Sequence, residues 1–165
     1  MVVSIKLLQI IGQEILISMI NNLKIKLDEV NKNIFNCGEC IQPLNVIGYP
    51  YPMHVGKNSK LNIVVVGQSP GIAFQKDDII QKEYSTKLSY EEHMRRYSES
   101  LGKSLIISFI QKYFNLAFND LVWTNLTKCT YKNNIAPTQE DLEHGKIHLF
   151  EQLSVIQNQV KIIIT

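Results

Sequence analysis

The chain has 165 residues, of which 45% are hydrophobic and 19% charged, values typical of one globular domain with a sizeable core. Its formal net charge of +2 is too small to indicate nucleic-acid binding and too small to exclude it, because a local basic patch decides such binding. No apolar run reaches the roughly 20 residues that a membrane span needs, so we expect no membrane partner. The apolar N-terminus also lacks the cleavage site of a signal peptide.

The cysteine count bears on the cellular compartment. Cys37, Cys40 and Cys129 make an odd number, which argues against a closed disulfide framework. We therefore expect a cytoplasmic protein whose thiols are free or bound to metal. We expect it to be a monomer with a single domain over residues 1–165.

Helical and strand patterns alternate along the sequence. Apolar residues at helical spacing predict a helix over residues 4–33, and a loop rich in Pro, Gly and Asn follows over residues 41–60. The β-branched run at 61–66 predicts a strand buried on both faces. Ser89 and Glu92 form a capping-box pattern that predicts a short helix. The remaining predictions are a helix over 104–118, a turn at Asn119-Asp120, a strand over 121–126, a helix from Pro137 to about Gln159, and a strand over 160–165.

This order predicts an α/β fold, with a central parallel sheet between two layers of helices. Ligands of such sheets bind at the carboxyl ends of the strands. Two strand ends carry polar residues: the segment Gly67–Gly71 (GQSPG) follows the first strand, and Asn125 ends the second. The glycines permit close approach of backbone to ligand, although a plain turn explains the segment equally well. The segment lacks the Gly-Lys-Ser/Thr of a Walker phosphate loop.

The side chain of Asn125 suits recognition of a base. Its amide offers a donor and an acceptor, which can pair with the O4 and N3–H edge of a pyrimidine such as uracil. Capping of local backbone is the commoner role of a lone asparagine.

Cys37 and Cys40 form a C-x-x-C pair, which is found in redox, zinc and iron–sulfur sites. Thioredoxin-type redox chemistry does not fit, because the pair follows a helix and precedes a loop. Buried thiols without metal are the alternative. The four histidines are scattered, and packing or surface roles are the default for each: His54, His93, His144 and His148.

Taken in order, the segments CGEC, VVVGQSPG and TNLTKCTYKNNIAPTQEDLE resemble the uracil-DNA glycosylase superfamily, most closely its iron–sulfur branch, family four. The resemblance covers about residues 15–165 and rests on the order and spacing of the motifs. It implies a three-layer α/β/α fold of the uracil-DNA glycosylase type. It also implies hydrolysis of the N-glycosidic bond of uracil, or a related damaged base, in DNA during base-excision repair.

The resemblance assigns roles to individual residues. Asn125 takes the position of the asparagine that recognises uracil, and Gln68 and Ser69 lie in the loop that places the hydrolytic water. The implied binding positions are Gly67, Pro70 and Gly71 in the same loop, Tyr97 or alternatively Phe74 stacking on the flipped base, and Lys128 beside a DNA phosphate. Core packing explains the two aromatic residues nearly as well, and solvation is the default for a surface lysine.

The same resemblance implies a [4Fe–4S] cluster held by Cys37, Cys40 and Cys129. The position of the fourth cysteine is Gly145, so the ligand set is incomplete. The neighbouring His144 would substitute only if its helix rotated. A three-cysteine cluster, a zinc ion and no metal all stay open.

Two further departures bear on activity. Gln68 and Ser69 occupy positions where relatives carry an acid, and neither is a good base at neutral pH. The family's last strand and its His-Pro-Ser loop have no counterpart before Thr165. Both departures favour a second hypothesis, a non-catalytic nucleic-acid or nucleotide-binding module on the same fold. A third hypothesis is a small-molecule α/β enzyme with no role on DNA.

Overall fold

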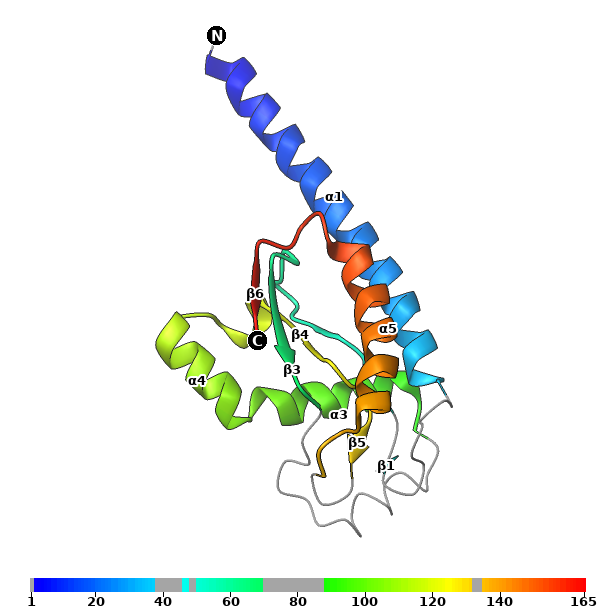
Figure 1. Cartoon of the computed structure of the whole chain (residues 1–165). Helices are drawn as coiled ribbons and strands as arrows, with labels where there is room; N and C mark the ends of the chain where they lie inside the picture. Colours follow the sequence, from blue (N-terminus) through cyan, green and yellow to red (C-terminus); the bar gives the residue numbers. More distant parts are fainter. Residues whose placement is uncertain (1, 38–45, 48–49, 70–87, 132–134) are drawn as a thin grey trace.

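The computed structural model describes residues 2–37, 46–47, 50–69, 88–131 and 135–165 (Figure 1). Over these residues the chain is a mixed α/β structure with four α-helices and a mostly parallel four-stranded sheet. No helix in the described part combines the length and the apolarity that crossing a membrane requires.

The central sheet has the strand order β2-β4-β3-β6. The three strands predicted from sequence are present and mutually parallel: β3 (Ile63–Gly67), β4 (Val122–Asn125) and β6 (Ile162–Ile164). β2 (His54–Val55) adds an antiparallel edge beside β4. A separate antiparallel pair joins β1 (Val46–Ile47) to β5 (Thr130–Tyr131). Strands of two residues have no periodicity, so neither β1 nor β2 was predicted inside the expected loop 41–60.

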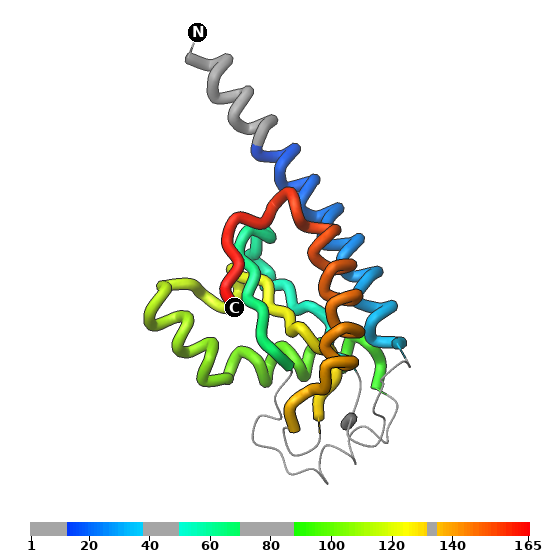
Figure 2. Tube along the Cα trace, viewed as in Figure 1, coloured from blue at the N-terminus to red at the C-terminus, as the bar shows by residue number. Residues whose placement is uncertain are grey.

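Polar caps define the ends of the helices, and the cap of α3 is the one that the sequence predicts. Ser89 accepts a hydrogen bond from the Glu92 amide and caps α3 (Tyr90–Gly102), which is longer than expected. Asn115, in the left-handed conformation with φ 53°, ends α4 (Leu105–Phe114) earlier than expected. A capping box between Thr138 and Asp141 begins α5 (Gln139–Ile156). Figures 1 and 2 show α5 alongside the C-terminal half of the long helix α1 (Val2–Phe35).

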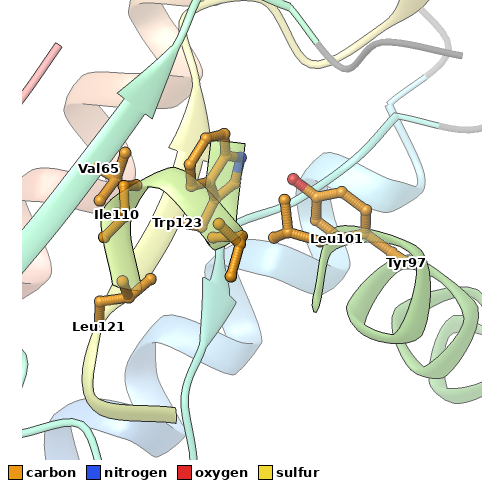
Figure 3. Packing of buried hydrophobic residues seen from close by; sticks show 7 residues of the cluster. Val65, Tyr97, Leu101, Ile110, Leu121 and Trp123 are labelled. Atoms are coloured by element: carbon orange, nitrogen blue, oxygen red, sulfur yellow. The ribbon is translucent and has the colours of Figure 1, made fainter. Parts of the chain in front are cut away.

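Successive strand residues point to opposite faces of the sheet and build two hydrophobic clusters. Val64 and Val122 join a cluster with Leu27 of α1 and Ile156 of α5. The neighbouring residues Val65 and Trp123 join a second cluster, shown in Figure 3, with Leu121 just before β4 and with four side chains of α3 and α4: Tyr97, Leu101, Ile107 and Ile110. Both clusters therefore contain residues of β3 and β4, but α5 contributes to the first cluster and α3 to the second.

Candidate functional site

The carboxyl ends of β3 and β4 lie side by side, with Gly67 paired to Asn125. Backbone hydrogen bonds continue the pairing beyond the strands. The Leu126 amide donates to the Gly67 carbonyl at 2.7 Å, and the Thr127 amide donates to the Gln68 carbonyl at 3.0 Å. The structure therefore brings together the two polar segments that the sequence singled out at separate strand ends.

The Asn125 side chain is buried, with 2% of its surface exposed. Its amide nitrogen donates a hydrogen bond to the Tyr97 hydroxyl at 3.1 Å. A Cβ atom placed on Gly67 would lie 2.5 Å from the Asn125 Oδ1, which is too close for any side chain. Position 67 must therefore be glycine for the Asn125 amide to take this orientation.

Tyr97 reaches this site from α3 with its ring inside the hydrophobic cluster of Figure 3. The centroids of the Tyr97 and Tyr51 rings are 4.8 Å apart, and the Tyr97 hydroxyl points toward Trp123. Burial raises the pKa of the Tyr97 hydroxyl above its usual value, so the group stays protonated. The structure thus places Tyr97 as a core residue, which is the alternative that the sequence left open, with its hydroxyl on the Asn125 amide.

Lys128 is buried rather than exposed toward a phosphate. Its ammonium donates to the Thr124 hydroxyl and to the Asn125 carbonyl, both at 2.6 Å. Burial lowers the pKa of Lys128 to about 7, because the charged form loses its hydration. The lysine therefore holds the end of β4 in place from inside the protein.

The loop after β3 is described only in part. The Gln68 side chain is exposed and that of Ser69 is half-buried. The Gln68 carbonyl also accepts a hydrogen bond from the Thr127 hydroxyl at 3.3 Å, which fixes the start of the loop. The other predicted positions on this side, Pro70, Gly71 and Phe74, lie outside the described residues.

A second group of chemically active side chains lies where the end of α1 meets α5. Cys37 lies two residues beyond the end of α1 at Phe35, and His144 and His148 lie one turn apart on α5. The Cys37 sulfur is 3.9 Å from the His144 Nε2, and ligand atoms of all three residues lie within 4.8 Å of one another. The sequence analysis missed this grouping, although the four-residue spacing of the two histidines is a signal for it.

These side chains border a small cavity that extends to Lys128 and Cys129. Cys129 is disulfide-bonded in this structure, contrary to the expectation of free or metal-bound thiols, whereas Cys37 carries a free thiol. Cys40 lies outside the described residues. A Cβ atom on Gly145 would lie 2.3 Å from the Leu126 carbonyl oxygen, so this position has no room for a fourth cysteine. The described residues therefore do not fit a four-thiolate iron–sulfur cluster that includes position 145.

Comparison with known proteins leaves the function to be inferred from these residues. No family model matches the chain, and no curated protein matches it.

Proposed function

We propose that the chain is a uracil-DNA glycosylase-like protein that binds uracil, or a related damaged base, where β3 and β4 end. The observation that carries the proposal is the pairing of Gly67 with Asn125, which sets a buried amide against a glycine at adjoining strand ends. Parallel sheets bind their ligands at this edge. The resemblance of VVVGQSPG and TNLTKC to the glycosylase motifs points to the same two positions.

The proposed reaction uses the Asn125 amide on the leaving base. A glycosylase takes the base out of the stack and reads its edge. Water forms a bond to the sugar carbon, the bond to the uracil nitrogen breaks, and its electron pair stays on the departing uracil, while a water proton passes to solvent. The Asn125 amide nitrogen carries two hydrogens, of which Tyr97 accepts one, and the other can stabilise the uracil anion. Gln68 and Ser69 orient the water without acting as strong bases, so we expect slow hydrolysis.

The proposal includes the three-layer α/β/α arrangement of this superfamily. Two observations support it. The cluster around Val64 recruits α1 and α5, and the cluster around Val65 recruits α3 and α4. Adjacent strand residues face opposite sides of a sheet, which supports the proposal that the two pairs of helices cover different faces.

A second candidate function is a non-catalytic nucleic-acid or nucleotide-binding module. The neutral side chains at Gln68 and Ser69 favour it, because neither is a good base at neutral pH. This candidate predicts binding of uracil-containing DNA without release of the base.

The test is uracil release from a single-stranded oligonucleotide under single-turnover conditions, with thymine in place of uracil as the substrate control. The wild-type chain is compared with Asn125→Ala and with Tyr97→Phe. The Tyr97→Phe variant keeps the buried ring and removes only the hydroxyl that accepts from Asn125. Thermal unfolding of each variant reports whether its fold is retained.

The proposal predicts uracil release by the wild-type chain, at least a tenfold loss in Asn125→Ala, and retained release in Tyr97→Phe. Equal losses in both variants would assign Asn125 a structural role through Tyr97 and would contradict the proposal. Specific binding without release would support the non-catalytic module. A chain that neither binds nor releases uracil would refute both functions.

A further inference from the structure

We propose that Cys37, His144 and His148 form a zinc site that joins the end of α1 to α5. In tetrahedral zinc sites, Zn–S bonds of about 2.3 Å and Zn–N bonds of about 2.0 Å place sulfur and nitrogen roughly 3.5 Å apart. The Cys37 sulfur and the His144 Nε2 are already 3.9 Å apart, and all three ligand atoms lie within 4.8 Å of one another. Small side-chain movements therefore complete the geometry. This inference does not depend on the glycosylase proposal.

The orientation of the His148 ring favours metal binding. Its Nδ1 lies 3.2 Å from a carboxylate oxygen of Glu151. An ionised carboxylate only accepts hydrogen bonds, so Nδ1 carries the proton and Nε2 carries the lone pair. That Nε2 atom is buried and has no hydrogen-bond partner among the described residues. A histidine bound to zinc through one nitrogen while the other donates to a carboxylate is the usual arrangement in zinc proteins.

Gly145 explains how α5 comes close enough to present these histidines. A Cβ atom at this position would lie 2.3 Å from the Leu126 carbonyl oxygen and 2.9 Å from the Thr127 Cα. The absence of a side chain lets α5 lie directly on the segment that follows β4. A cysteine here would push the helix away, whereas His144 reaches Cys37 without any rotation of the helix.

The chemistry of the donor set selects the ion. One thiolate and two imidazoles form a mixed sulfur and nitrogen site of the kind that zinc occupies, whereas iron–sulfur clusters need mostly thiolates. The site therefore differs from the cluster that the sequence resemblance implies. Zinc here fastens two helices that are far apart in the sequence.

The probe is Co²⁺ added to metal-free protein in the presence of a thiol reductant, which removes the Cys129 disulfide as a variable. We expect one Co²⁺ per chain, with a thiolate charge-transfer band and the visible spectrum of a tetrahedral ion, both abolished by adding Zn²⁺. Zinc should also raise the melting temperature in a concentration-dependent way.

Four variants distinguish the ligands. Cys37→Ser should lose the charge-transfer band, and His148→Ala should weaken Co²⁺ binding by at least tenfold. Glu151→Gln leaves the ligands intact at a largely exposed position and should weaken binding by roughly tenfold, the size of outer-shell effects in zinc sites. Cys129→Ser, the matched control at another cysteine of the same cavity, should bind as the wild type does.

Two results would overturn the inference. The first is undiminished Co²⁺ binding by folded Cys37→Ser, or by Glu151→Gln if Cys37→Ser does not fold. The second is loss of the metal in folded Cys129→Ser, which would assign the ligands to the cysteine set of an iron–sulfur site instead.

Discussion

Replacing Gly145 with alanine tests the packing that brings α5 onto the end of β4. In an ordinary helix interior this change stabilises by about 1 kcal/mol, because alanine restricts the unfolded chain and favours the helix. Here the added methyl group would lie 2.3 Å from the Leu126 carbonyl oxygen and 2.9 Å from the Thr127 Cα. Both obstacles are backbone atoms, which cannot rotate out of the way as a side chain can.

The magnitude follows from the distances. An ordinary contact begins at 3.4 Å, so the helix and the segment after β4 must separate by about 1 Å. Overpacking of this kind typically costs about 1–3 kcal/mol, and more where backbone has to move. The shift would also stretch the hydrogen bonds that Gln152 of α5 makes to Thr124 and Asn31, now 3.0 and 2.7 Å long. After the gain in helix propensity, we expect a net loss of about 2 kcal/mol, or roughly 4–8 °C in melting temperature.

The assay is urea unfolding of the metal-free chain, monitored by circular dichroism. Gly102→Ala is the matched control, because its Cβ would meet the Phe118 ring at 3.3 Å, and a ring can turn aside. We expect this control to stay within about 1 kcal/mol of the wild type. A Gly145→Ala variant as stable as the wild type would show that α5 does not lie as close to β4 as the structure has it.

The remaining predictions concern pH. His54 and His93 are buried, and desolvation lowers the pKa of each to about 4. Unfolded histidines take up protons below about pH 6.5, so stability present above that pH is lost as the pH falls toward 4. At pH 5 we expect each histidine to lower the free energy of unfolding by about 2 kcal/mol. In urea unfolding of the metal-free proteins, the free energy of unfolding of His93→Gln should fall less between pH 7.5 and 5 than that of the wild type. An equal fall in both proteins would contradict this prediction. Burial lowers the pKa of Lys128 to about 7 in the folded state, whereas the unfolded lysine has a pKa of about 10.4. Between these two pH values the unfolded state therefore binds a proton that the folded state has released. The free energy of unfolding of the wild type should therefore rise by about 2 kcal/mol between pH 7 and 9 because of this group, and Lys128→Met should abolish that rise. The same pH dependence in Lys128→Met as in the wild type would place the lysine in contact with solvent.

The features that the sequence predicted correctly are those set by local interactions. Ser89 marks a helix start that the structure confirms, the helix predicted from Pro137 begins two residues later as α5, and the β-branched run at 61–66 marks β3. The end of α4 at Asn115 was not predicted, because an asparagine enters the left-handed conformation only where the following chain requires it. The two-residue strands β1, β2 and β5 depend on their partners rather than on any pattern of their own.

The candidate site was predictable only as far as strand order determines it. Parallel strands place their carboxyl ends at one edge, so the meeting of Gly67 and Asn125 follows from the alternation of elements. The burial of Lys128 does not, because a lysine is ordinarily solvated and this one is held by the Thr124 hydroxyl and a backbone carbonyl. Steric limits such as the one at Gly145 depend on another segment's backbone, which no local pattern reveals.

The rotation of α5 about its axis explains why His144 reaches Cys37. Residues 144, 148 and 152 recur every four positions, so they share one face of the helix. On that face Gln152 is fully buried, and its amide donates to the Asn31 side chain of α1 at 2.7 Å while its carbonyl oxygen accepts from Thr124 at 3.0 Å. Rotating α5 would leave these buried polar groups unpaired, at about 1–3 kcal/mol for each group. The Gln152 bonds therefore fix the helix in the one orientation that also turns both histidines toward the end of α1.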